Sequence, residues 1–544
     1  MYQDGLLTVG LLISLLFLYG FVIYPLLRVL GVGFSPEALP LYARFLQQPE
    51  TGRVILNTIG VGLSVASLGT ILAFMLVFMQ VKVDVPLKRF FHLITILPVI
   101  APPFVMAMSI ITLFGRSGII TKRLLGIRYD IYGAEGLIFA LTLSFLPIAY
   151  LSLLGMMRAL DPSLDEAATN LGAGRWLILR KITIPLLLPG FASSFLLLFV
   201  LAISDLGNPL LLGGSFNVLS TSIYLAIVGQ FDLTAGAVLA VLLMIPSMAI
   251  FFFQHYWLSK RSYVTITGKP TGRPQLITSP EVKWPLFIAN GLIIGLILLL
   301  YVNILVGAFT KVWGINFTPT LDHFYFVLSG YGSEAILDTI FLAGIATPIA
   351  GLGGILIAFL VVRRQFFGRA LIDLTSMLGA AVPGIIVGIG LVLAYNQSHL
   401  AGLVPKLTGT AFIIVMAFTV RCIPAAVRGG VAALQQIDTS MEEAALSLGA
   451  SPTTTFRKIT LALIRPAFFA GLIWGFAHSM TSLSPIIFLV TPEWRIMTAQ
   501  ILNEAEAGRF GNAAAYSVVL ILIVLTAIGL LQVTVGSSTG AERV

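Results

Sequence analysis

The sequence has little charge and a single cysteine. Only 10% of its 544 residues are Asp, Glu, Lys or Arg, whereas a soluble domain has about 25%, and 58% are hydrophobic. This shortage of charge excludes a soluble enzyme and a disordered chain. Cys422 alone cannot form an intramolecular disulfide or a cysteine-based metal cage. The five histidines are scattered, so the sequence predicts no metal site.

Long apolar runs fill most of the chain. One crossing of a bilayer takes about 20 apolar residues, so the runs predict roughly twelve spans. The predicted spans are 6–27, 54–79, 94–114, 137–154, 191–212 and 235–253 in the first half, and 285–305, 336–362, 378–395, 412–426, 468–490 and 513–533 in the second. The runs are continuous rather than alternating, which excludes a porin-like barrel. We therefore expect an all-α polytopic protein embedded in a lipid bilayer.

The net charge of +9 indicates topology rather than a nucleic-acid partner. Most of the 32 Lys and Arg residues fall in inner loops if both termini are cytoplasmic, as the positive-inside rule favours. Residues 259–283 are rich in Pro, Gly and basic residues and are predicted to be a cytoplasmic linker. The expected domains are thus a first half of six spans over 1–258, the linker, and a second half of six spans over 284–544.

Two similar segments occur at a fixed distance along the chain. LDPSLDEAATNLGAGRWLILRKITIPLLLPG starts at Leu160, and IDTSMEEAALSLGASPTTTFRKITLALIRPA starts at Ile437, an offset of 277 residues. The same offset relates Pro147 to Pro424 in the preceding spans. Because each half contains an even number of spans, both copies return to the same face of the membrane, as in a parallel repeat. The copies occupy inner loops near 160–190 and 437–467.

Each copy has the pattern of a short helix followed by a break. Ser163 to Glu166 and Ser440 to Glu443 match S-x-x-E, which predicts a capping box at the start of the helix. Gly172 and Gly449 are expected to end the helix, because glycine adopts a positive φ at little cost. We expect an acid-tipped helix that projects from the membrane at each copy.

The segments resemble the "EAA" coupling segment of permeases of ATP-binding-cassette importers. The pattern is E-A-A, three residues, Gly, nine residues, Ile, one residue, an aliphatic residue and Pro. The matching residues that the resemblance assigns to ATPase coupling are Glu166, Ala167, Ala168 and Gly172 in the first copy and Glu443, Ala444, Ala445 and Gly449 in the second. The second copy has Ala462 where the first has Pro185, so the helix that follows is expected to enter the membrane differently.

The resemblance extends to the ferric-iron type of binding-protein-dependent permease, through VRCIPAAVRGGVAAL from Val420 and LAISDLGNPLLLGG from Leu201. It implies a type I importer permease of about twelve helices in two parallel repeats, in a bacterial inner membrane. The implied partners are two copies of a cytoplasmic ATPase and a periplasmic or lipid-anchored solute-binding protein. No G-x-x-x-x-G-K-[ST] occurs, so no cofactor is expected in this chain, and ATP and Mg are expected on the partner ATPase.

Polar residues inside the predicted spans are candidates for the substrate pathway. Arg421 is costly in hydrocarbon, and both a pathway role and a structural pair or snorkelling position stay open. Asp205 and Asn208 lie beside Gly and Pro, where an unwound helix suits a passing cation, although a packing hydrogen bond is the alternative. The equivalent stretch of the second half contains His478 and Ser482 without an acid. A lone histidine there is more often buried than metal-bound.

Two alternatives remain open at this point. Thiamine, organophosphonate, sugar-phosphate or polyamine import fits the same architecture, since Arg421 favours an anionic cargo and Asp205 a cationic one. An ion-coupled secondary transporter of six plus six helices also has parallel repeats. A secondary transporter of this kind has no function for the paired acid-tipped loops.

Overall fold

The computed structural model describes residues 5–258, 276–398, 406–455, 458–459 and 461–536. Within these residues, eleven helices are long and apolar enough to cross a membrane, or twelve if the bent pair α17 (Arg369–Ala381) and α18 (Gly384–Tyr395) is one span. The predicted all-α membrane architecture is thereby confirmed. Residues 259–275 of the predicted linker lie outside the described residues.

The chain divides into two compact units. Unit 1 comprises Met1–Tyr42, Ala226–Met244 and Asp322–Val544, and unit 2 comprises Ala43–Leu225 and Ile245–Leu321. These units do not follow the expected division at the linker, because the first span of each sequence half belongs to the unit that contains most of the other half. The division of the sequence into halves at 259–283 stays a prediction about the repeat.

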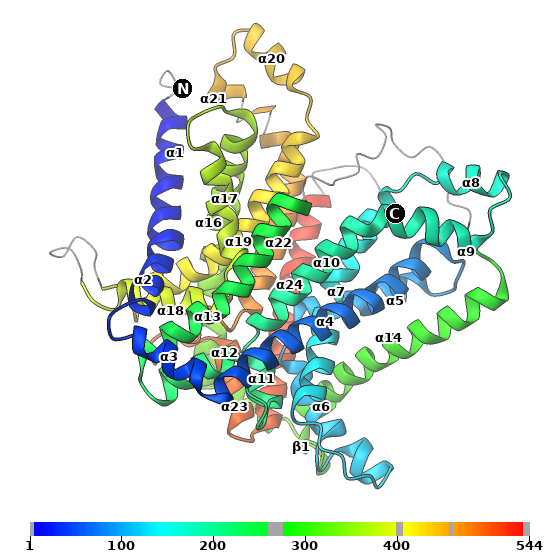
Figure 1. Cartoon of the computed structure of the whole chain (residues 1–544), viewed down its shortest axis with the longest axis vertical. Coiled ribbons are helices and arrows are strands. Elements are labelled where there is room, and N and C mark those ends of the chain that lie inside the picture. Colours follow the sequence, from blue (N-terminus) through cyan, green and yellow to red (C-terminus); the bar gives the residue numbers. More distant parts are fainter. Residues whose placement is uncertain (1–4, 259–275, 399–405, 456–457, 460, 537–544) are drawn as a thin grey trace. The chain divides into compact units, whose positions relative to one another are not determined.

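Unit 1 is built of helices from the first span and from most of the second sequence half. Its elements are α1 (Gly5–Leu18), η1 (Tyr19–Ile23), α2 (Tyr24–Gly33), α15 (Asp322–Leu328), α16 (Tyr331–Arg363), α17 (Arg369–Ala381), α18 (Gly384–Tyr395), α19 (Ala411–Gln435), α20 (Thr439–Ser447), α21 (Pro452–Thr455), α22 (Leu461–Thr481), α23 (Met497–Glu506) and α24 (Phe510–Gly536). Helices α16, α19 and α22 pack against one another, as Figure 1 shows.

Unit 2 repeats this arrangement with α4, α7 and α10. Its elements are α4 (Pro49–Lys82), α5 (Lys88–Ile96), η2 (Leu97–Ile100), α6 (Val105–Phe114), η3 (Ile119–Leu124), α7 (Ala134–Ala159), α8 (Ser163–Asn170), α9 (Arg175–Ile178), η4 (Leu179–Thr183), α10 (Ile184–Ser204), α11 (Gly207–Leu212), α12 (Leu219–Tyr224), η6 (Phe253–Leu258), α14 (Pro280–Ala308), β1 (Thr310–Val312) and β2 (Asn316–Pro319). Three elements cross the unit boundaries: α3 (Leu39–Gln47), η5 (Leu225–Gly229) and α13 (Leu233–Phe252). The strands β1 and β2 form one antiparallel hairpin.

The first span of the second sequence half, α14, packs in unit 2 against α4, α5 and α6. Its buried positions recur at helical spacing, from Asn290 through Ile294 and Ile297 to Asn303, while Leu292 on the opposite side is exposed. Asn303 donates to Ser109 Oγ at 2.8 Å and to Thr112 Oγ1 at 2.8 Å, and these contacts satisfy a polar group that lies inside the unit. Exposed Leu and Ile side chains on the outside of such a helix suit contact with lipid.

The first span of the chain packs in unit 1 on the α17–α18 pair and on α16. The hydroxyl of Tyr395 donates to the carbonyl of Gly20 at 2.7 Å, and Arg28 Nε donates to the carbonyl of Leu393 at 3.2 Å. Both bonds join residues more than 360 positions apart in the sequence. The polar contacts therefore fix the first span to this unit.

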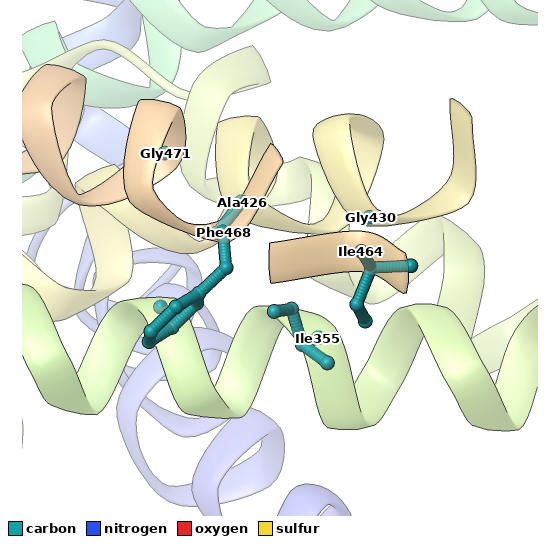
Figure 2. Close-up of a pocket in the computed structure, with 7 residues that line it drawn as sticks. Ile355, Ala426, Gly430, Ile464, Phe468 and Gly471 are labelled. Atoms are coloured by element: carbon teal, nitrogen blue, oxygen red, sulfur yellow. The ribbon is translucent and has the colours of Figure 1, made fainter. Parts of the chain in front are cut away.

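A small apolar pocket lies among α16, α19 and α22 in unit 1. It is lined by Gly351, Ile355, Ala426, Gly430, Ile464, Phe468 and Gly471. Figure 2 shows Ile464 and Phe468 of α22 above Ile355 of α16. At the 277-residue offset, the first half has Leu153 in place of Gly430 and Ser194 in place of Gly471. The smaller residues of the second half account for the hollow.

Candidate functional site

The two coupling segments begin with the same cap, which is not the predicted one. Asp161 Oδ1 accepts the backbone N–H of Ser163, and Asp438 Oδ1 accepts that of Ser440, each at 2.9 Å. The Ser–Glu capping box predicted from S-x-x-E is wrong, because Asp at the preceding turn already satisfies the first free N–H group. The hydrogen bond from Ser440 lowers the pKa of Asp438. The sequence pattern that indicates this Asp cap is D-x-S, which occurs in both copies.

The predicted ends of both helices are confirmed. Gly172 has φ +83° and Gly449 has φ +86°, a left-handed conformation that glycine adopts without strain. Just beyond them, Ala173 N–H donates to Ala168 O at 2.9 Å and Ala450 N–H donates to Ala445 O at 3.0 Å. These bonds close the helix in a Schellman-type turn.

The chain then restarts as a second helix in both copies. In the second copy, Ser451 Oγ accepts the N–H of Thr454 at 3.2 Å, so the predicted cap before Pro452 is confirmed. The following spans α10 and α22 begin at Ile184 and Leu461, which are 277 residues apart. Residue 460, directly before α22, lies outside the described residues, so the expectation that Ala462 changes how the second span enters the membrane stays a prediction.

The tip of each coupling segment carries an exposed leucine. Leu171 is 88% exposed and Leu448 is 89% exposed, and each directly precedes the positive-φ glycine. Glu166 is partly exposed and Glu443 is exposed. Trp176, which is also exposed, occurs only in the first copy. Both units thus present a helix end with an apolar tip, although the coupling role of these residues remains a prediction.

The two coupling segments are fastened to their units by different contacts. In unit 2, the ammonium of Lys82 at the end of α4 forms a salt bridge with the carboxylate of Asp165 in α8. In unit 1, Arg363 at the end of α16 donates to the carbonyls of Leu434 at 3.0 Å and Ile437 at 2.9 Å. Neither contact is predictable from sequence patterns, because the partners of both basic residues lie more than 70 positions away.

A break at the end of the span after each coupling segment is the second repeated feature. Helix α10 ends at Ser204, and the carbonyl of Asp205 accepts the hydroxyl of Ser220 at 2.7 Å. Helix α22 ends at Thr481, and the carbonyl of Ser482 accepts the hydroxyl of Thr498 at 2.8 Å. The interruption predicted beside Asp205 is present in both halves.

These breaks lie against a second interrupted span in each unit. A Cβ added to Gly207 comes within 2.5 Å of the ring of Phe104, which lies between η2 and α6. In unit 1, a Cβ on Gly384 comes within 3.2 Å of Pro485, and Gly384 follows the 108° bend between α17 and α18. Close backbone approach at glycine therefore joins two helix interruptions inside each unit.

The candidate pathway residues divide between the units. Asp205 and Asn208 in unit 2 are hydrogen-bonded to each other. In unit 1, Ser482 Oγ donates to the carbonyl of His478 at 2.6 Å, and the His478 ring stacks on Trp474 at 4.7 Å between centroids. Arg421 instead binds the backbone at the α17–α18 bend. The described residues contain no group of three His, Cys, Asp or Glu placed to hold a metal ion.

Comparison with known proteins identifies the family. The chain matches the binding-protein-dependent transport system inner membrane component family over residues 65–262 and 350–535. It is 35% identical to the ferric transport system permease protein FbpB of Actinobacillus pleuropneumoniae, over 97% of this chain and 78% of that protein. It is 25% identical to the Fe(3+)-transport system permease protein FbpB 2 of Haemophilus influenzae, over 95% of both chains.

Among solved structures, a bacterial ABC transporter involved in the import of the acidic polysaccharide alginate matches 48% of this chain and 98% of its own. The two share 17% sequence identity and a TM-score of 0.40. The family match covers the span, coupling segment and helix break of each half. The chain therefore belongs to the binding-protein-dependent transport system inner membrane components.

Proposed function

We propose that this permease belongs to an ATP-driven importer of ferric iron, which a separate solute-binding protein delivers. The assignment of iron as the cargo rests on the similarity, over nearly the whole chain, to two permeases named for ferric transport. The buried carboxylate of Asp205 suits a cationic cargo. Thiamine, organophosphonate, sugar-phosphate and polyamine are the other cargoes that the experiment below distinguishes.

ATP hydrolysis is assigned to a partner. The sequence contains no G-x-x-x-x-G-K-[ST] loop to hold the phosphates of ATP, so ATP and Mg bind to the partner ATPase and this chain carries no cofactor. The two coupling segments have the same cap, the same left-handed glycine and the same exposed leucine. Two matching docking segments fit two copies of one ATPase.

The exposed leucines supply the apolar contact of that docking. Leu171 and Leu448 project from the ends of α8 and α20, where they are nearly fully exposed. Burying a leucine side chain in a partner groove contributes about 1.5 to 3 kcal/mol. The Glu-Ala-Ala residues form the helical turns before this tip. Docking at both tips lets closure of an ATPase dimer move the two spans α10 and α22.

The orientation and partners follow from the same proposal. Coupling segments that bind a cytoplasmic ATPase lie on the inner face, which agrees with cytoplasmic N- and C-termini in a bacterial inner membrane. The binding protein then docks on the outer face. A secondary transporter lacks any use for paired docking segments, and family membership favours dependence on a binding protein.

Co-purification of the tagged full chain from its native membrane, followed by mass spectrometry, tests the assembly. We expect two ATPase copies per permease and, after cross-linking, a solute-binding protein whose bound ligand is iron. The matched control is the Leu171→Asp/Leu448→Asp double variant, which should lose the ATPase and keep its place in the membrane. A permease that is isolated alone, and that takes up solute under an ion gradient, contradicts the proposal.

A further inference from the structure

Asp205 is a buried acid with no basic partner among the residues that the structure describes. Its side chain lies at the end of α10, and the residue is 9% exposed. Its Oδ2 accepts the backbone N–H of Asn208 at 2.9 Å and the Asn208 Nδ2 at 3.0 Å. No salt bridge to Asp205 occurs within the described residues. A buried carboxylate without a counter-charge is costly, so its retention calls for a reason.

Asn208 provides a second oxygen without a partner. The residue is fully buried, at 0% exposure, and its Oδ1 has no hydrogen-bond donor in the part of the chain that the structure describes. The amide cannot be turned to relieve this, because its Nδ2 donates to the Asp205 carboxylate. One carboxylate and one amide oxygen therefore lie together with acceptor capacity left over.

The second half shows that the helix break itself needs no acid. In the second half, the hydroxyl of Thr498 donates to the carbonyl of Ser482 at 2.8 Å. The hydroxyl of Ser220 donates to the carbonyl of Asp205 in the same way in the first half, at 2.7 Å. At the place of the carboxylate, Ser482 turns its hydroxyl back to the carbonyl of His478. The cap on Asn208 also needs only an oxygen, which Asn or Ser supplies as well as Asp. The negative charge of Asp205 is thus unexplained by the fold.

The carbonyl end of α10 also attracts a cation to this position. The last carbonyls of α10 lack partners within the helix and form the negative end of its dipole. The Asp205 carboxylate accepts an N–H in the first turn of α11, and the carbonyl end of α10 attracts a cation. Hard cations take carboxylate and carbonyl oxygens as ligands.

We propose that Asp205 and Asn208 form a cation subsite at the first-half helix break, where a permeating ferric ion binds in transit. The subsite has no equivalent acid in the second half, so only one half of the repeat holds it. This inference rests on the proposed function, from which it takes the cationic cargo.

Asp205→Asn separates charge from capping, because the amide oxygen still accepts from Asn208. The purified full chain in nanodiscs is titrated with ⁵⁵Fe(III) citrate, and ATP-driven ⁵⁵Fe uptake is measured with the ATPase and binding protein reconstituted. We expect at least tenfold weaker iron binding and at least tenfold slower uptake for Asp205→Asn, with partial recovery in Asp205→Glu. Glu493→Gln, which removes the charge of an exposed acid outside the candidate pathway residues, is the control and should match the wild type.

A second variant covers the case in which Asp205→Asn does not fold. Asn208→Ser keeps the backbone N–H that caps Asp205 and removes the amide oxygen, so iron binding should weaken several-fold. Wild-type binding in Asp205→Asn or in a folded Asn208→Ser overturns the subsite, even if uptake falls. If the wild-type assembly itself takes up no iron, the proposed function fails instead, and the two failures are thereby distinguished.

Discussion

Arg421 and Ser144 occupy equivalent positions in the repeat, and each donates to backbone carbonyls at a helix interruption. Ser144 Oγ donates to the carbonyl of Pro103 at 2.9 Å, while Arg421 Nη1 donates to the carbonyls of Gly379 at 2.7 Å and Val382 at 3.1 Å. The Arg421 Nε has no hydrogen-bond partner within the described residues. The contact made by Arg421 therefore favours the structural interpretation over a place in the pathway.

Removing the Arg421 side chain should destabilise unit 1. Arg421→Ala leaves two buried carbonyls without a donor, at a cost of about 1 to 3 kcal/mol for each unsatisfied group. Ser144→Ala, the matched control, removes one donor and should cost less. The single cysteine, Cys422, is buried in α19, so a thiol-reactive dye reports its exposure on thermal unfolding. Equal unfolding midpoints for Arg421→Ala and the wild type contradict this account.

Replacing the left-handed glycines should impair coupling without unfolding the spans. Gly172→Val and Gly449→Val place a β-branched residue at positive φ, a strain of about 1 to 3 kcal/mol. An added Cβ meets no atom within 4 Å at either position, so the effect is conformational. ATPase co-purification and uptake should both fall.

Gly174→Ala is the control for these variants. Gly174 has φ −69°, and a Cβ added there also meets nothing within 4 Å. The variant should therefore couple normally. Coupling that is equal in Gly172→Val and Gly174→Ala refutes the role given to the turn.

The apolar pocket in unit 1 offers a stabilising substitution. Gly471 lies inside α22, and an added Cβ finds open space there. Gly471→Ala should stabilise unit 1 by about 0.5 to 1 kcal/mol, because alanine loses less backbone entropy on folding. Gly430→Ala is the counterpart, since its Cβ comes within 2.8 Å of Ala358 Cβ and forces α19 away from α16. The thermal midpoint of Cys422 labelling should rise in Gly471→Ala and fall in Gly430→Ala. Shifts of the same sign in the two variants contradict this packing.

The Glu504–Arg509 ion pair at α23 should lose its stabilising effect only at low pH. Burial alone raises the pKa of Glu504, but hydrogen bonds from Arg509 and Asn512 outweigh it and hold the pKa below its ordinary value. This stabilisation is therefore full at neutral pH and lost as the pH falls through the lowered pKa, below about 4.3. Glu504→Gln should lower the melting temperature by circular dichroism at pH 7 and have little effect near pH 3. Glu493→Gln, at an exposed acid, is the control; a pH-independent difference for Glu504→Gln contradicts the assignment.

The sequence predicts those parts of the structure that depend on local composition and on the repeat. Apolar runs locate the spans, because a bilayer requires a nearly fixed length of apolar chain. Gly172 and Gly449 end their helices because no other residue adopts positive φ so easily. The capping prediction fails because Asp161 and Glu166 compete for the backbone N–H of Ser163, and S-x-x-E alone does not show that Asp161 accepts it.

Contacts between distant segments lie beyond such patterns. Nothing in the apolar runs indicates that the first span packs with residues near 390, or that Lys82 pairs with Asp165. The offset of 277 residues pairs Asp205 with Ser482 and Arg421 with Ser144, but only coordinates show which backbone carbonyls these side chains hold. The sequence thus identifies the candidate residues and leaves their roles to the geometry.

ATP-driven uptake of ⁵⁵Fe(III) into proteoliposomes tests the central claim most directly. The vesicles contain this permease with its co-purified ATPase, and the iron-loaded binding protein is supplied outside. We predict uptake that requires internal ATP and the binding protein, and that falls in the Gly172→Val/Gly449→Val variant. Iron uptake that proceeds without ATP, or ATP-driven uptake of another solute with none of iron, contradicts the account.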